Sequence, residues 1–321
     1  MLGRTIVALG LTWSSIALPA LADVYPQRPI RMIIPSPPGG GTDIVARLLA
    51  KHLTDALGQS VIVENRAGGN NNIAAELAAK ATPDGHTLLI ASATILAVNA
   101  VLGKVTYDPA RDFAPITLLG SQPHLMVVHP AVPANSVQEF VALAKSKPSQ
   151  LNLASGGTGG PSHLAGELLM LVAGIKLTHI AYKGTGPALL DLIGGRTQVG
   201  VLTLASSLTQ VKAGRLRGLA VTSPKRITVV PEFPTIAESG YPGYEARTWY
   251  GLLVPGRTPK TVITRLYTET KAVLQNPEVV RKLADDGAEP GGNSPAEFAA
   301  YIREESERWS KVIRSAGIKA E

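Results

Sequence analysis

Two glycine-rich segments carry the residues that could do chemistry, because each combines hydroxyl side chains with bare backbone N–H groups. Residues 35–43 read P-S-P-P-G-G-G-T-D, and residues 154–163 read A-S-G-G-T-G-G-P-S-H. Each segment follows a short apolar run and precedes an amphipathic stretch, which predicts a strand–loop–helix connection. Glycine lets the backbone approach a ligand closely, and a helix start presents unpaired N–H groups with a partial positive charge. The sequence therefore predicts two anion-binding loops that a two-lobed chain could close on one small anion.

Several side chains in and near these segments are candidates for ligand contact. Thr42 is favoured because its hydroxyl and its N–H group both face the mouth of the first loop. For Asp43 the favoured interpretation is a helix-start charge paired with Arg47, with direct ligand contact as the alternative. Lys183 ends another predicted strand and is interpreted either as a fixed charge for the ligand or as a solvated residue at the rim.

Further hydroxyl side chains, together with one imidazole, follow predicted strands or lie in the second loop. Those that we expect to line a pocket are Ser155, Thr158, Ser162, His163, Thr94, Ser206 and Ser207. Trp249 and Tyr250 fall where the chain is expected to cross between lobes, and hinge packing is favoured over ligand stacking for them.

Motifs of most enzyme classes are missing from the sequence. It contains no Walker A motif, no G-x-G-x-x-G in either glycine loop, no G-x-S-x-G and no H-E-x-x-H. Its six histidines lack metal-ligand spacing, so we expect no metal and no cofactor. A hydrolase with Ser155 or Ser162 as nucleophile and His163 as base is the enzymatic alternative. It is disfavoured because Ser162 and His163 are sequence neighbours without a third member.

The amino-terminal residues 1–22 are expected to be a cleaved signal peptide rather than part of the fold. Arg4 precedes an apolar run over residues 6–18, and residues 20–22 form an A-x-A cleavage signal. The alternative is a membrane anchor, but Thr12, Ser14 and Ser15 interrupt a run that is already short for a span. We therefore predict a periplasmic protein.

Composition limits the remaining function classes. The chain has 321 residues, 45% of them hydrophobic, a formal net charge of +7 and no cysteine. The basic residues form no concentrated stripe and aromatic residues are few, so nucleic-acid binding is not expected. The length is comfortable for two domains, which must be stabilised by a hydrophobic core rather than by disulfides.

An alternation of strand and helix patterns predicts an α/β fold with parallel sheets and right-handed crossovers. Strands are expected at residues 30–34, 61–63, 87–91, 125–129, 151–153, 177–181, 199–202 and 216–221. Helices are expected at residues 44–57, 73–81, 136–147, 164–173, 187–193, 260–274, 278–286 and 295–316, with Ser136 and Glu139 forming a capping box. We expect lobe one to comprise residues 23–122 and 246–321 and lobe two residues 123–245. The crossings would lie near residues 120–124 and 244–252.

The order of motifs resembles that of the Bug-type substrate-binding proteins of tripartite tricarboxylate transporters. The resemblance is carried by residues 35–47, 58–66, 83–89, 112–115, 162–164, 182–184, 213–216, 234–238 and 249–252. It implies a type II periplasmic binding protein, a two-lobed Venus flytrap. In that family, backbone amides and ordered waters of the two glycine loops hold a ligand carboxylate. The chain departs from the family at Ser36, where Phe is frequent, at Ala100, where Pro is common, and at residues 70–72 and 203–206, which leaves the ligand open.

Together these arguments predict a monomeric, non-enzymatic receptor. It would bind a small organic carboxylate (a di- or tricarboxylate, an acidic amino acid or an aromatic acid) and deliver it to a membrane permease. A receptor of the same fold that feeds a sensor kinase is the alternative. The predicted ligand-binding residues are Ser36, Gly40, Gly41, Thr42, Asp43, Thr94, Ser155, Thr158, Gly159, His163, Lys183 and Ser206.

Overall fold

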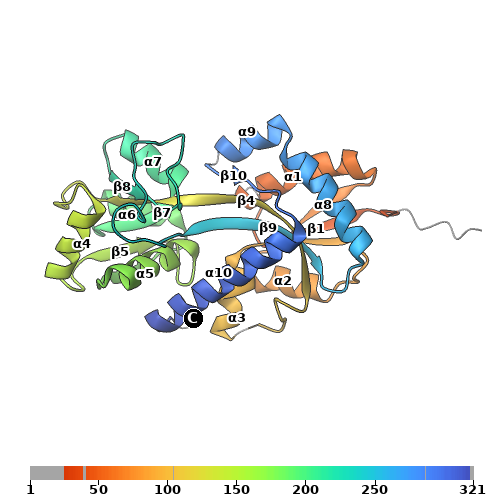
Figure 1. The fold of residues 1–321 in the computed structure, drawn as a ribbon, viewed down its shortest axis with the longest axis horizontal. Helices are drawn as coiled ribbons and strands as arrows, with labels where there is room; N and C mark the ends of the chain where they lie inside the picture. Colours follow the sequence, from red (N-terminus) through yellow and green to blue (C-terminus); the bar gives the residue numbers. More distant parts are fainter. Residues whose placement is uncertain (1–24, 39–40, 104, 286, 319–321) are drawn as a thin grey trace, which may run out of the picture.

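The computed structural model describes residues 25–38, 41–103, 105–285 and 287–318. Within them the chain forms an elongated molecule of two lobes that lie side by side (Figure 1). The two-lobed α/β architecture predicted from the sequence is confirmed. In the described part of the chain, no helix combines the length and the apolar character that crossing a membrane requires.

The first lobe is built on three parallel strands in the order β2-β1-β3. They are β1 (Ile30–Ile34), β2 (Val61–Asn65) and β3 (Thr87–Ala91). Its helices include α1 (Gly41–Leu57), α2 (Asn72–Ala79), α8 (Lys260–Leu274) and α9 (Pro277–Asp285). The predicted bounds of β1, β3 and α8 are confirmed to the residue, because buried apolar runs and one-sided helical patterns are strong signals.

The second lobe repeats this design with parallel strands in the order β7-β5-β6. They are β5 (Asn152–Ser155), β6 (Thr178–Ala181) and β7 (Val199–Thr203), accompanied by β8 (Arg217–Val221). Its helices are α4 (Val137–Ser146), α5 (Pro161–Ala173), α6 (Thr185–Ile193) and α7 (Leu204–Lys212). The sequence analysis missed α7, whose hydroxyl-rich start weakens the helical pattern.

The start of α4 corrects one predicted motif. Ser136 accepts a hydrogen bond from the Glu139 N–H group at 3.1 Å, as expected for a cap. The Glu139 carboxylate, however, accepts from the Asn135 N–H group at 2.8 Å, one residue before the cap. The reciprocal half of the predicted capping box is therefore made with the preceding residue.

Two long antiparallel strands join the lobes. They are β4 (Phe113–Val128) and β9 (Arg247–Pro255). Residues 113–123 of β4 pair with β9, whereas residues 124–128 pair with β7 and β8 of the second lobe. The predicted strand 125–129 is thus the end of a 16-residue strand. Pro115, Gly120 and Pro123 conceal its first part in the sequence, and two register shifts near Pro115 and Gly120 accommodate the interruption.

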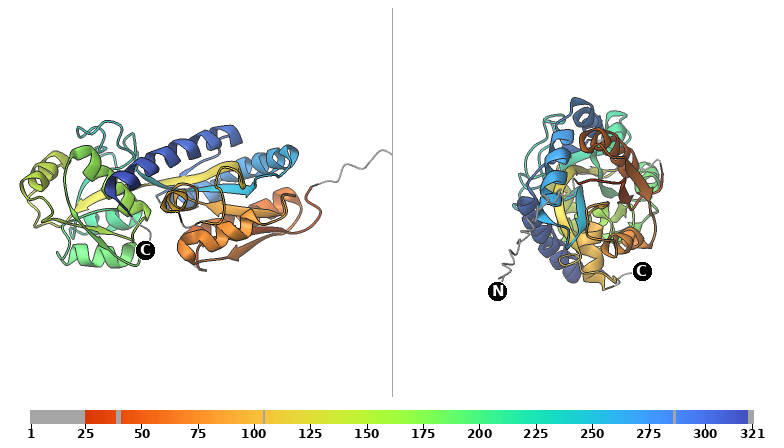
Figure 2. Two further views of the ribbon diagram at one scale, coloured as in Figure 1. Left: turned by 90° about the horizontal axis from the view of Figure 1, so that it is seen from below. Right: turned by 90° about the vertical axis from the view of Figure 1, so that its right-hand side faces the viewer.

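The remaining elements lie around these strands. β3 is followed by the π-helical turn η2 (Thr94–Val98) and the short helix α3 (Asn99–Leu102), and η1 (Gly69–Asn71) precedes α2. The short strand β10 (Glu289–Pro290) pairs with β4. The helix α10 (Pro295–Ala316) starts at a reciprocal capping box of Ser294 and Glu297. It packs on η2 of the first lobe and on α5 of the second (Figure 2), so it braces one side of the crossing strands.

Candidate functional site between the lobes

The carboxyl ends of the parallel strands of both lobes face the junction between the lobes, where open α/β sheets place their ligands. The second glycine loop lies close to the first lobe, because a Cβ atom at Gly159 would be 3.7 Å from Val98 Cγ1 and 3.9 Å from Leu102 Cδ1. A Cβ atom at Gly287 of the first lobe would be 3.7 Å from Ala205 Cβ at the start of α7. The lobes therefore approach each other at two separate places.

The first glycine loop is described at its two flanks. Gly39 and the predicted site residue Gly40 lie outside the described residues, and Gly41 begins α1. Thr42 is half-buried in the first turn of that helix. Ser36 is also half-buried, and its carbonyl group accepts a hydrogen bond from Asn65 Nδ2 at 3.0 Å.

Asp43 anchors the start of α1 to the end of β2. The residue is 3% exposed. It accepts from Arg47 Nε at 2.9 Å and from Asn65 Nδ2 at 2.8 Å. The predicted pairing with Arg47 is confirmed. Asn65, which the sequence analysis overlooked, is the last residue of a strand next to β1, and that position was the available signal.

The second glycine loop is held by its own side chains. The N–H group of Gly156 donates to Ser162 Oγ at 2.9 Å, and that of Gly157 donates to Ser155 Oγ at 3.2 Å. The N–H group of Gly159 donates to His163 Nδ1 at 2.9 Å. The expectation of bare N–H groups is therefore wrong at these three glycines, because hydroxyl and imidazole groups from the same segment accept their hydrogen bonds.

Two histidines stack behind this loop. The rings of His163 and His179 are nearly parallel, with centroids 3.7 Å apart. His179 Nε2 lies 2.6 Å from Ser155 Oγ, and His163 Nε2 lies 3.1 Å from Glu167 Oε1. The sequence analysis missed His179 and Glu167. Their signals were the pairing of β6 with β5 and the i,i+4 spacing on α5.

The other predicted site residues occupy different positions around the junction. Thr94 is buried at the start of η2. Thr158 is half-buried, and Lys183 is exposed on the connection between β6 and α6. Ser206 is half-buried in the first turn of α7, with its hydroxyl 2.6 Å from Thr203 Oγ1.

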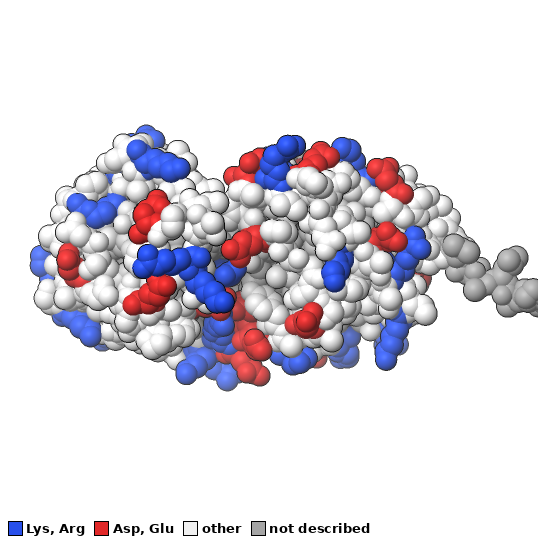
Figure 3. Space-filling view, turned by 45° about the horizontal axis from the view of Figure 1, so that its top comes forward, with Lys and Arg blue, Asp and Glu red and all other residues white. Residues whose placement is uncertain are grey.

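A pocket of about 240 Å³ lies between the lobes. It is lined by Val45, Leu119, Gly120, Ser121, Gln122, Thr203, Ala205, Ser206, Tyr250, Leu283 and Ala288. The lining thus combines α1, β4, β9 and α9 of the first lobe with the β7–α7 connection of the second. Figure 3 shows the molecule hollowed between its lobes, with acidic and basic side chains interspersed on both. Among the described lining residues none carries a formal charge.

Trp249 faces away from this pocket and packs at the hinge. It is 1% exposed and lies edge-on to the rings of Phe298 and Tyr301. Its Nε1 donates to Glu305 Oε2 at 2.8 Å, and Trp309 Nε1 donates to the same oxygen at 2.9 Å. Burial raises the pKa of the Glu305 carboxyl. The hinge-packing interpretation is confirmed for Trp249, whereas Tyr250 lines the pocket.

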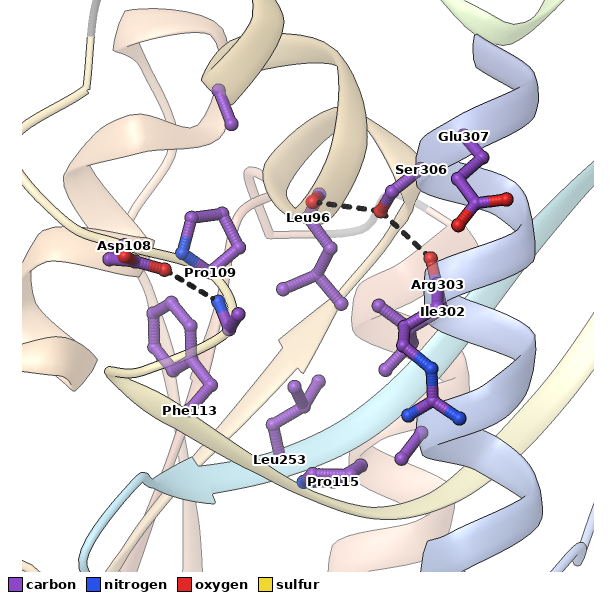
Figure 4. A pocket seen from close by; sticks show the side chains of 13 residues that line it. Leu96, Asp108, Pro109, Phe113, Pro115, Leu253, Ile302, Arg303, Ser306 and Glu307 are labelled. Atoms are coloured by element: carbon purple, nitrogen blue, oxygen red, sulfur yellow. Dashed lines mark hydrogen bonds between the residues drawn. The ribbon is translucent and has the colours of Figure 1, made fainter. Parts of the chain in front are cut away.

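A second cavity, of about 430 Å³, lies between α10 and η2 (Figure 4). It is separate from the pocket at the junction of the two lobes. Leu96, Phe113, Leu253 and Ile302 form its apolar wall, with Asp108, Arg303 and Glu307 around its edges. None of the predicted ligand-binding residues lines it. The junction between the lobes is therefore the candidate site.

Known proteins share both the sequence and the fold. The pattern of a family described as "Tripartite tricarboxylate transporter family receptor" matches residues 45–318. Protein BugT of Bordetella pertussis is 37% identical over 98% of this chain and 97% of its own. A solved R. palustris protein with adipate is 38% identical, with a TM-score of 0.79, over 92% of this chain and 99% of its own. MatC from Rhodopseudomonas palustris with bound malate is 31% identical, with a TM-score of 0.75, over 90% of this chain and all of its own.

Proposed function

This chain belongs to the tripartite tricarboxylate transporter receptor family, and from that premise we propose that it captures a small organic carboxylate between its lobes for a membrane permease. Members of this family are solute-binding receptors. The observation that carries the proposal is the approach of the second glycine loop to the first lobe, where Gly159 comes close to Val98 and Leu102. A ligand at this junction would contact both lobes and so favour their closed arrangement.

The proposed ligand-binding residues are those predicted from the sequence. On lobe one they are Ser36, Gly40, Gly41, Thr42, Asp43 and Thr94, and on lobe two Ser155, Thr158, Gly159, His163, Lys183 and Ser206. The hydrogen bonds within the protein separate these residues into those that hold the loops in shape and those that we propose contact the ligand. Asp43, Ser155 and His163 are already engaged within the protein, so we propose that they hold the loops in shape. Thr42, Thr158 and the helix starts are then the proposed direct contacts.

We propose the same lobe bounds as the sequence indicated, with residues 23–122 and 246–321 in lobe one and 123–245 in lobe two. Strand pairing supports this division, because β4 changes partner from β9 to β7 after Pro123. Two long strands, β4 and β9, cross between the lobes, so we propose that the lobes move relative to each other by twisting or bending of these strands. We expect a monomer.

The strength of such a site can be gauged from its donors. A hydrogen bond to a charged group contributes about 1.5–3 kcal/mol, and a helix start adds roughly 0.3–1 kcal/mol. A micromolar dissociation constant requires about 8 kcal/mol. Three or four donors together with burial of the ligand's carbon skeleton reach this value after ordering costs.

We further propose that the protein is not an enzyme. Ser155 is fully buried, and its hydroxyl already contacts His179 and the Gly157 N–H group. His163 uses one ring nitrogen for Gly159 and the other for Glu167. Neither histidine is poised next to an exposed nucleophile. Ester hydrolysis by the wild-type protein that His163→Ala abolishes would contradict this.

We propose that the mature protein acts in the periplasm after removal of residues 1–22, which lie outside the described residues. The relatives support this location, since a solved structure that is 39% identical is described as a periplasmic transporter. Mass spectrometry of the exported protein would test it, and the expected amino terminus is Asp23.

The central test is a titration of the mature protein with mono-, di- and tricarboxylates, acidic amino acids and aromatic acids. We expect at least one class to raise the melting temperature and to change the tryptophan fluorescence. Trp249 and Trp309, which share the Glu305 carboxylate near the crossing strands, should report closure. If no carboxylate stabilises the protein, the receptor proposal fails.

A further inference from the structure

The hydrogen bonds of His163 define where its ring carries a proton. A backbone N–H group can only donate, so His163 Nδ1, which lies 2.9 Å from the Gly159 nitrogen, accepts and carries no proton. The proton of the neutral imidazole is therefore on Nε2, which lies 3.1 Å from Glu167 Oε1. The Glu167 carboxylate is thus the acceptor that this tautomer requires.

The stacking of the two histidine rings leaves one choice open. His163 is buried, and its ring plane lies within 9° of the ring plane of His179. Stacking fixes the plane of the ring, but a half-turn about the Cβ–Cγ bond preserves that plane and exchanges Nδ1 with a carbon atom. The Gly159 N–H group would then lose its acceptor. The polar partners of the ring, Gly159 and Glu167, are what distinguish the two orientations.

Glu167 lies one turn further along α5 than His163. The i,i+4 spacing places both side chains on one face of the helix. The Glu167 side chain is 14% exposed, so water is a poor substitute for it at this position. Among the residues that the structure describes, no lysine or arginine forms an ion pair with Glu167. It does not line the pocket between the lobes, which places it behind the histidine rather than against a ligand.

The orientation of the His163 ring matters where the two lobes meet. Gly159 has a φ of +71°, in the left-handed region, and a Cβ atom there would be 3.7 Å from Val98 Cγ1 of the first lobe. The hydrogen bond to His163 holds this glycine in place. A change in the ring would therefore alter the part of the second loop that approaches the first lobe.

We propose that Glu167 is a positioning residue of the ligand site, which fixes the proton and the orientation of the His163 ring and, through that ring, the second glycine loop. This inference rests on the proposed function, because the loop is one half of the proposed carboxylate site. Without the carboxylate, the Nε2–H group has no acceptor, and part of the molecules adopt the other ring orientation or tautomer. The Gly159 N–H group is then released.

The first test needs no ligand. Nitrogen NMR of the mature protein labelled at histidine should show the His163 proton on Nε2, and a proton on Nδ1 in the wild type overturns the inference. Glu167→Met removes the acceptor, whereas Glu167→Gln retains one in its amide oxygen. We expect hydrogen exchange at the Gly159 amide to be about fivefold faster in Glu167→Met than in Glu167→Gln. Equal exchange in the two variants also overturns the inference.

The second test measures binding by calorimetry, with whichever of malate, citrate, glutamate and benzoate binds the wild type most tightly. Both replacements remove the same negative charge, so their difference reports the hydrogen bond and not the electric field at an anion site. We expect Glu167→Met to bind this acid about fivefold more weakly than Glu167→Gln. Equal affinities would overturn the inference while the proposed function stands.

A double-mutant comparison separates the action through His163 from other effects of Glu167. His163→Asn places an acceptor oxygen at the position of Nδ1 but is too short to reach Glu167. In this background the difference between Met and Gln at position 167 should fall below about twofold. A difference that persists would overturn the inference, and the exchange comparison decides it if His163→Asn does not fold. If Gly159 responds as expected but no carboxylate binds the wild type, the proposed function fails and Glu167 remains the residue that holds this loop.

Discussion

The two glycine loops occupy equivalent places in the two lobes, yet the contacts that the structure describes at the flanks of the first differ in chemistry from those within the second. Beside the first loop, the buried Asp43 carboxylate joins Arg47 and Asn65. In the second loop, hydroxyl and imidazole side chains accept hydrogen bonds from the backbone N–H groups of the glycines themselves. Among the described residues, the first strand–loop–helix connection is thus stabilised by a charge at its flank and the second by acceptors inside the loop. The difference predicts different responses to mutation.

The largest effect is expected at the charged anchor. Asp43→Ala removes one of the two acceptors of Arg47 and one acceptor of Asn65, and it should lower the free energy of unfolding by about 2–3 kcal/mol. Urea denaturation at pH 7 measures this, and carboxylate affinity should fall with it. A loss below that of Ser162→Ala would show that the charge is not the stronger anchor.

The stability of the hinge between the lobes should depend on pH through His124. This residue is the first of β4 to pair with β7. Burial lowers the pKa of the His124 imidazole to about 4, so the folded protein excludes a proton that the unfolded chain binds below pH 6.5. The free energy of unfolding should therefore fall by about 2 kcal/mol between pH 7 and pH 5 because of this residue alone. In urea denaturation, the loss of unfolding free energy between pH 7 and pH 5 should be larger by this amount in the wild type than in His124→Gln. Equal pH dependence in both would contradict the assignment.

The neutral acceptors of the second loop should each contribute less than the charged anchor. Ser162→Ala leaves the Gly156 N–H group without its acceptor and should cost about 1–2 kcal/mol in the free energy of unfolding. Ser162→Thr, which retains a hydroxyl, serves as the matched control in the same denaturation experiment. If Ser162→Ala is as stable as the control, the loop does not depend on this bond.

The smallest effect is expected at the exposed partner of the charged anchor. The Arg47 side chain is 54% exposed, so Arg47→Met should cost less than about 1 kcal/mol. The comparison with Asp43→Ala in one denaturation series separates the buried carboxylate from its solvated partner. A cost equal to that of Asp43→Ala would mean that the ion pair acts as one unit.

Local patterns were sufficient for most elements. The buried runs of β1 and β3, the one-sided pattern of α8 and the cap and proline that start α10 are signals of neighbouring residues, and all four elements lie where they were predicted. The Asp43–Arg47 pair was likewise predicted from i,i+4 spacing. Patterns failed where local residues argue against the structure, as in β4 with its two prolines.

The sequence by itself therefore determined the α/β alternation, the two-lobed layout and the positions of both glycine loops, because these follow from periodicity and from helix-start chemistry. Only the tertiary structure decided which loop N–H groups are used internally, because their acceptors depend on side-chain direction. It also decided that Asn65 and His179 complete the two loops, since each reaches its partner from a neighbouring strand. The uncharged pocket is likewise a tertiary property, because its walls come from segments of both lobes that are distant in sequence.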